Sequence, residues 1–164
     1  NQNRVTALLQ STLALRGLTE RPFGLHGPTW DEDKFIAEYM SAPSQALWQC
    51  WYLAAQLPVL YLGGKIPEAL KNIEQALAIP LEKVIYGQYQ RVDYYFFATL
   101  TKIADWENAD AKTRGDYRKF IDECLGHMNI WVEKCYADSF RGREALMRAE
   151  LARVEGDAYR ASER

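Results

Sequence analysis

Residues 64–77 have the sequence GKIPEALKNIEQAL, and their apolar side chains follow the i, i+3, i+4, i+7 spacing of a helix that buries one face. These side chains are Ile66, Ala69, Leu70, Ile73, Ala76 and Leu77. Upstream, an aromatic-rich segment runs from Pro43 to Leu62 and ends at Gly63-Gly64, a pair that stops helices. Because proline removes a backbone hydrogen bond, Pro58 should kink this segment. We therefore predict a hairpin of two helices, joined at the paired glycines.

Helical spacing recurs in the rest of the chain, whereas no convincing alternation of apolar and polar residues indicates a strand. In the first predicted helix, Val5, Leu8, Leu9 and Leu13 form the apolar stripe. Thr29 to Glu32 has the pattern of a capping box ahead of the second helix. The remaining stripes are Phe35–Met40, Val92–Trp106, Tyr117–Cys135 and Leu146–Val154, and a further helix begins after Gly156. The chain is thus predicted to be all-α, an array of antiparallel hairpins with about seven or eight helices.

Composition favours one compact domain over residues 1–164, because the chain is 48% hydrophobic and 26% charged. The net charge is -2 and no block of five like charges occurs, which disfavours nucleic acid or a membrane surface as the partner. The most apolar stretch, Trp51 to Leu62, is too short to cross a bilayer, and no signal peptide is present, so we expect a cytoplasmic protein. The chain lacks an initial methionine and stops at Arg164 inside an amphipathic pattern, which suggests a piece of a longer polypeptide. The apolar face of its last hairpin is expected to favour a homodimer of that piece.

No residue pattern indicates catalysis, a cofactor or a metal. The three cysteines are odd in number and lack ligand spacing, so buried reduced thiols are expected at Cys50, Cys124 and Cys135. Gly64-Lys65 lacks both flanks of a phosphate-binding loop. The acidic run Asp31 to Asp33 precedes a helix, where capping explains it better than a cation site. We therefore predict that this chain is not an enzyme.

Two passages place a glycine at a helix corner and an alanine five residues later, namely Gly64 with Ala69 and Gly156 with Ala161. Glycine permits the tight corner and alanine lets two helix backbones approach closely. The pattern resembles a tetratricopeptide hairpin, although the two glycines are not separated by a multiple of the roughly 34-residue repeat. The resemblance implies an irregular right-handed superhelix of helical hairpins.

Further motifs resemble the helical segment of bacterial multi-sensor signal transduction multi-kinases, which follows an AAA or STAND-type ATPase module. The motifs lie at Leu15 to Thr19, Asp31 to Phe35, Trp131 to Cys135 with Ser139-Phe140, and Glu144 to Gly156. The resemblance implies a non-catalytic interaction or spacer module that couples an NTPase or kinase region to sensor and output domains. The implied partner is a protein, either a neighbouring domain or a signalling protein.

Aromatic residues supply the candidate contact surface, which we assign to Trp51, Tyr61, Tyr94 and Arg153. One alternative is a helical sensor whose rings on helices 43–62 and 92–106 enclose a small apolar ligand. A simpler alternative is that two adjacent helices pack these rings against each other. A carboxylate clamp of the kind that holds peptide C-termini is not expected, because Trp51, Ala54 and Pro58 occupy the matching face.

Overall fold

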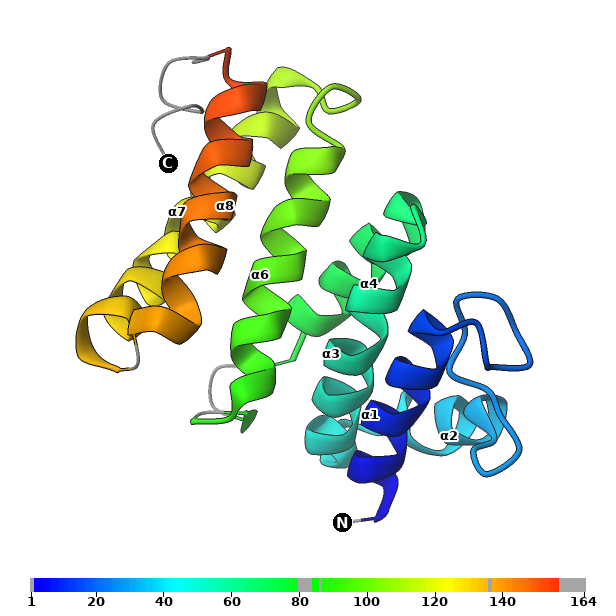
Figure 1. Ribbon diagram of the computed structural model, residues 1–164. Coiled ribbons are helices and arrows are strands. Elements are labelled where there is room, and N and C mark those ends of the chain that lie inside the picture. Colours follow the sequence, from blue (N-terminus) through cyan, green and yellow to red (C-terminus); the bar gives the residue numbers. More distant parts are fainter. Residues whose placement is uncertain (1, 80–83, 86, 136, 157–164) are drawn as a thin grey trace. The chain divides into compact units, whose positions relative to one another are not determined.

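The computed structural model describes residues 2–79, 84–85, 87–135 and 137–156, and all regular secondary structure within them is helical (Figure 1). The elements are α1 (Gln2–Leu15), α2 (Glu32–Tyr39), the 3-10 helix η1 (Pro43–Gln45), α3 (Ala46–Leu62), α4 (Ile66–Leu77), α6 (Tyr89–Ala104), α7 (Ala111–Lys134) and α8 (Ala137–Val154). The all-α prediction is thereby confirmed. The chain divides into two compact units, Asn1–Tyr94 and Tyr95–Arg164, which are described separately below.

The predicted hairpin is present as α3 and α4, which pack against each other. The corner is tight because Gly64 has a positive φ of 69°, and the Lys65 amide donates back to the Leu60 carbonyl at 2.8 Å. Ala69 is fully buried, as expected of a small residue between crossing helices. α3 continues through Pro58 to Leu62. At the second corner Gly156 also has a positive φ, whereas Ala161 and the predicted last helix lie outside the described residues.

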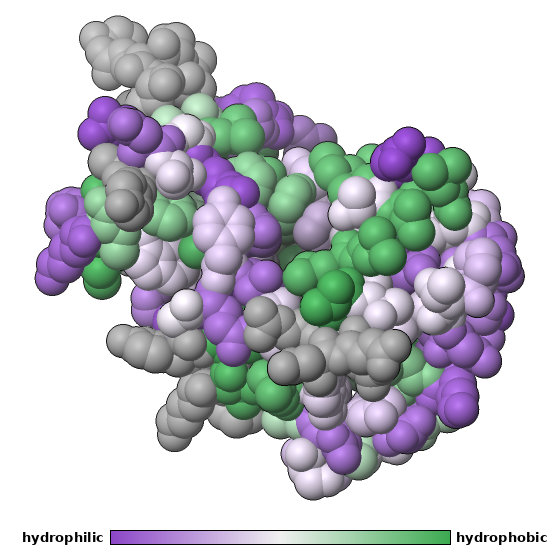
Figure 2. All heavy atoms as spheres, turned by 60° about the horizontal axis from the view of Figure 1, so that its bottom comes forward, coloured by the Kyte–Doolittle hydropathy of each residue, from purple (hydrophilic) through white to green (hydrophobic). Residues whose placement is uncertain are grey.

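α1 packs on α3, but the face that it buries is not the leucine stripe that the sequence predicted. It buries the opposite face. The buried positions are Ala7, Gln10 and Ser11, whereas Val5 is 64% exposed and Leu9 is 51% exposed. Small side chains allow two helices to approach closely, so Ala7 and Ser11 suit this contact better than branched residues do. Other apolar residues also gather in patches on the molecular surface (Figure 2).

α2 begins two residues later than the expected capping box. Its N-cap is Asp31, whose carboxylate accepts from the Lys34 amide at 3.0 Å, and not Thr29. The capping role expected for the acidic run is therefore confirmed at Asp31. Phe35 then stacks near Tyr39 and Tyr52, with ring centroids 4.8 and 5.3 Å away, and so fixes α2 on α3.

The second unit contains the end of α6 together with α7 and α8, and the latter two pack against each other. α7 starts at Ala111, earlier than the stripe from Tyr117 indicated, because Asp110 caps it by accepting from the Thr113 amide at 2.7 Å. Tyr95 of α6 stacks near His127 and Trp131 of α7, with ring centroids 5.2 and 6.0 Å away. His127 thus packs among the aromatic rings between α6 and α7.

Candidate functional site

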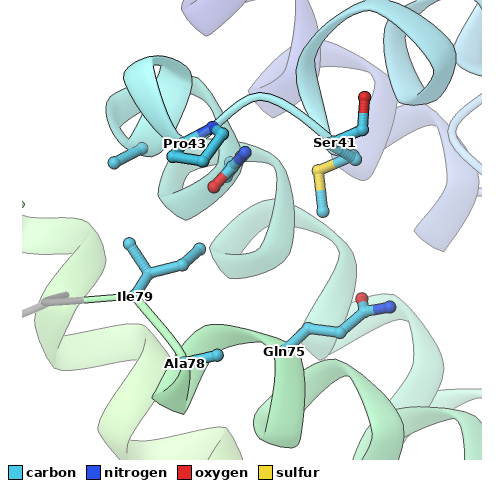
Figure 3. A pocket seen from close by; sticks show the side chains of 8 residues that line it. Ser41, Pro43, Gln75, Ala78 and Ile79 are labelled. Carbon is cyan, nitrogen blue, oxygen red and sulfur yellow. The ribbon is translucent and has the colours of Figure 1, made fainter.

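A groove runs between α2 and α4, within the first unit, and we call it the α2–α4 groove. It consists of two hollows of about 410 and 290 Å³, which share Met40 and Gln75 in their lining. In the larger hollow, Ser41 and Pro43 face Gln75, Ala78 and Ile79 (Figure 3). The smaller hollow is lined by Ile36, Met40, Tyr52, Gln56, Leu60, Glu68, Lys71, Asn72 and Gln75.

Helix periodicity places these residues along the groove. The floor comes from one face of α3, because Ala46, Gln49, Tyr52, Gln56 and Leu60 are three or four positions apart. On α4 the buried stripe of Ala69, Ile73 and Ala76 holds the helix against the core. The neighbouring face, from Glu68 to Gln75, lines the groove together with Ala78 and Ile79 in the turn that follows the helix.

A chain of hydrogen bonds crosses the floor of the smaller hollow and links three helices. The Asn72 amide donates to Gln56 Oε1 at 3.0 Å, the Gln56 amide donates to the Tyr52 hydroxyl at 2.9 Å, and that hydroxyl donates to Glu32 Oε1 at 2.9 Å. Burial and the adjacent Glu32 carboxylate raise the pKa of Tyr52 well above the ordinary value of a tyrosine. Tyr52 therefore keeps its proton and remains the donor.

Gln49 forms the floor of the larger hollow and also ends α2. Its amide nitrogen donates to the carbonyls of Tyr39 and Ala42 at 2.8 and 2.9 Å. Carbonyls at the end of a helix lack intrahelical donors, so the Gln49 amide supplies the hydrogen bonds that the backbone at the end of α2 would otherwise miss. Gln49 as a whole is only 7% exposed.

Two acceptors in the floor keep no partner among the described residues. Both hydrogens of the Asn72 amide are used, since the nitrogen also donates to the Leu53 carbonyl at 3.2 Å. Flipping the amide would place its oxygen against two acceptors, which fixes the assignment. Asn72 Oδ1 is buried and accepts no hydrogen bond, and Gln49 Oε1 accepts none from the described part of the chain.

The four sequence-predicted surface residues differ in burial. Trp51 and Tyr94 are 2% and 1% exposed, so they are core residues and offer no surface to a partner. Tyr61 is partly exposed at the end of α3. Arg153 is exposed on α8 and forms an ion pair with Glu150 at 2.8 Å.

The groove residues Gln49, Gln56 and Asn72 were not expected to be functional. A signal was present in the sequence for two of them, because Gln49 and Gln56 interrupt the apolar run of the helix before Gly63, whereas Asn72 follows Lys71 in an amphipathic helix. Buried polar side chains need partners, so such interruptions identify candidate networks.

A second cluster lies at the start of α2, where ligand atoms of His26 in the preceding loop, the N-cap Asp31 and Asp33 in the first turn are within 4.8 Å of one another. Both carboxylates already have partners. Arg21 forms a two-pronged ion pair with Asp33 and lowers the pKa of that carboxyl, and Asp31 caps α2. We therefore interpret the cluster as a helix cap with an ion pair.

Of the three cysteines, Cys50 and Cys124 are buried as expected, whereas Cys135 is exposed. Cys135 forms the C-cap of α7, where the helix stripe that buries Cys124 has ended. Burial raises the pKa of the Cys50 thiol to about 11.

None of the described helices is both long enough and apolar enough to cross a membrane. Comparisons of the chain with family models, with curated proteins and with solved structures give no match in any of the three.

Proposed function

We propose that this chain is a protein-interaction module that binds an extended segment of another protein in the α2–α4 groove. The observation that carries the proposal is the shape of the groove, an open channel formed by two adjoining hollows of about 410 and 290 Å³. The lining residues of α4 run from Glu68 to Gln75, a distance of about 10 Å at the helical rise, which accommodates about three residues of extended chain, and Ala78 and Ile79 in the turn after α4 continue the lining.

The lining suits a peptide. Ile36, Met40 and Leu60 provide apolar contacts, and the exposed side chains of Glu68 and Gln75 can bond a main chain or a polar side chain. The walls belong to consecutive helices of one compact unit, so the binding surface is formed before a partner arrives.

The alternative of a small apolar effector near helices α3 and α6 has less support. It requires an enclosed apolar cavity among the aromatic rings, whereas Trp51 and Tyr94 are buried in packed surroundings and the α2–α4 groove has a polar floor.

The tetratricopeptide-like arrangement is part of the proposal. It is supported by the tight corner at Gly64 and the buried Ala69 where α4 crosses α3. In the signalling proteins that the sequence resembles, a module of this kind would couple an ATPase or kinase region to sensor or output domains.

The test is selection from a displayed library of random 12-residue peptides with the whole chain as bait. Selected peptides are then measured against a variant whose groove is filled by Gln75→Trp and Ala78→Trp, at two exposed positions. Binding should weaken at least tenfold in this variant, whereas Glu74→Trp, an exposed position of α4 outside the lining, should leave it unchanged. Failure to enrich any peptide, or equal binding to both Trp variants, would refute the proposal.

A further inference from the structure

We infer that the larger hollow of the α2–α4 groove receives an aromatic side chain of the partner segment, and that this side chain anchors the segment. The inference rests on the proposed function of the groove and specifies its ligand. It follows from the chemistry of the lining, the size of the hollow and the way in which its walls are held.

Apolar side chains dominate the lining of the larger hollow. Three of the lining residues are polar, namely Ser41, Gln49 and Gln75, and the others are Met40, Pro43, Ala46, Ala78 and Ile79. Ser41 and Gln75 are exposed, so their polar groups can turn toward water. A large apolar side chain therefore leaves water and gains contacts when it enters this hollow.

Gln49, the remaining polar residue of the lining, holds a wall of the hollow in place. Its amide nitrogen donates both hydrogens to the carbonyls of Tyr39 and Ala42, at 2.8 and 2.9 Å. These two bonds tie the segment that carries Met40 and Ser41 to α3. Because this wall is fixed before a partner arrives, less conformational freedom is lost when an anchor binds.

The hollow is wide because small side chains lie in its walls. Ala46 of α3 and Ala78 at the end of α4 extend no further than Cβ. The resulting volume of about 410 Å³ lies within the range of about 300–1,000 Å³ that is typical of ligand pockets, so it can hold a bulky side chain. Pro43 and Ile79 lie on opposite sides of the hollow (Figure 3), so a ring between them is covered on both faces.

Met40 favours an aromatic ring over an aliphatic chain. It lines both hollows of the groove, and its flexible thioether can adapt to a ring in either of them. Contacts between a thioether and an aromatic ring are favourable beyond their apolar area. Aromatic side chains also bury a large area while few torsions are fixed, which makes them the usual anchors of protein interfaces.

Gln75 provides a contact for the main chain of the anchored segment. It lines both hollows and is exposed, and its carboxamide has donors as well as an acceptor for a peptide group. A segment whose main chain bonds to Gln75 can therefore direct one side chain into the larger hollow.

The experiment compares three neutral probes, the N-acetylated amides of phenylalanine, leucine and glutamine, by NMR titration of the full chain. We expect the phenylalanine probe to shift the methyl resonances of Met40, Ala46, Ala78 and Ile79. It should bind about two- to tenfold more tightly than the leucine probe, the range of a sulfur–aromatic contact, and at least about tenfold more tightly than the glutamine probe. Equal binding of the three probes, or shifts confined to other parts of the chain, would overturn the inference.

Three variants provide the controls. Ala78→Leu fills part of the hollow from an exposed position and should weaken the phenylalanine probe at least fivefold. Glu74→Leu, one helical turn earlier and outside the lining, should leave binding unchanged. Met40→Leu removes the sulfur at similar size, so the preference for phenylalanine over leucine should fall below about twofold. Equal binding to the Ala78 and Glu74 variants would contradict a site in this hollow, and an unchanged preference in Met40→Leu would contradict the choice of an aromatic ring.

The two proposals fail in different ways. If displayed peptides bind the groove without enrichment of an aromatic residue, the anchor inference is wrong and the interaction module stands. If no peptide binds while the phenylalanine probe does, the interaction module is wrong, and the aromatic preference belongs to a site for a small molecule.

Discussion

Replacing Tyr52 by phenylalanine tests whether the hydrogen-bond chain under the groove stabilises the first unit. Phenylalanine keeps the ring that packs on Phe35, 5.3 Å away between centroids, and removes only the hydroxyl. Glu32, which is 5% exposed, then loses the donor that lies 2.9 Å from its carboxylate. Gln56 loses the oxygen to which its amide donates.

The expected loss in free energy of unfolding follows from the two hydrogen bonds of the Tyr52 hydroxyl. A hydrogen bond to a charged group contributes about 1.5–3 kcal/mol, and a neutral bond about 0.5–1.5 kcal/mol. Gln56 is half-buried and can turn toward water, so the total should be about 2–4 kcal/mol. For a chain of this size that corresponds to a fall of about 4–16 °C in melting temperature.

The assay is urea unfolding followed by circular dichroism, with Glu32→Gln and the double variant completing a mutant cycle. The cycle should give a coupling energy of about 1–2 kcal/mol between the two side chains. A Tyr52→Phe variant within 0.5 kcal/mol of the wild type, or a coupling energy near zero, would refute the stabilising role of the chain.

The pH dependence adds an independent measurement. Because the pKa of Tyr52 is raised in the folded protein, the unfolded chain loses this proton first, from about pH 10 upward. The contribution of Tyr52 to stability is therefore complete below pH 10 and falls above it by up to about 1.4 kcal/mol per pH unit. The stability difference between wild type and Tyr52→Phe should shrink over that interval, and a difference that grows would contradict the assignment.

Three further predictions concern thiols, the α3 corner and α1. At pH 8 a thiol reagent should label exposed Cys135 at least tenfold faster than buried Cys50, a contrast that disappears in denaturant. Gly63→Ala places a Cβ 2.3 Å from the Phe23 ring, so it should cost about 1–3 kcal/mol in urea unfolding and less in a Phe23→Ala background. Leu9→Gln should leave the free energy of unfolding within 0.5 kcal/mol of the wild type, because Leu9 is 51% exposed, and a loss above 2 kcal/mol would show that this face is packed.

Periodicity predicted the helical class and the α3–α4 hairpin because both depend on local spacing and on the glycines between them. Periodicity predicted the wrong buried face for α1, because the leucine stripe is the strongest local signal in that helix. The burial of Ala7 and Ser11 depends instead on how closely α1 approaches α3, which is a tertiary property. Thr29 fitted the spacing of a cap, yet Asp31 is the residue that caps α2.

The groove could not be predicted from the sequence because it, too, depends on tertiary packing. Gln49 and Gln56 are visible in the sequence as polar residues in an apolar region, but their partners are set by tertiary packing. Gln56 meets Asn72 through the register of α3 against α4, and Gln49 meets the carbonyls at the end of α2. The abundance of aromatic residues suggested a contact surface. Trp51 and Tyr94, however, are buried core residues.

The boundary between the two compact units falls inside α6, between Tyr94 and Tyr95. Cutting the chain there would divide one helix into pieces shorter than the roughly 12–15 residues that an isolated helix needs. Separate production of the units therefore calls for two overlapping polypeptides, the first ending after Ala104 and the second beginning at Tyr89, so that each carries the whole of the shared helix.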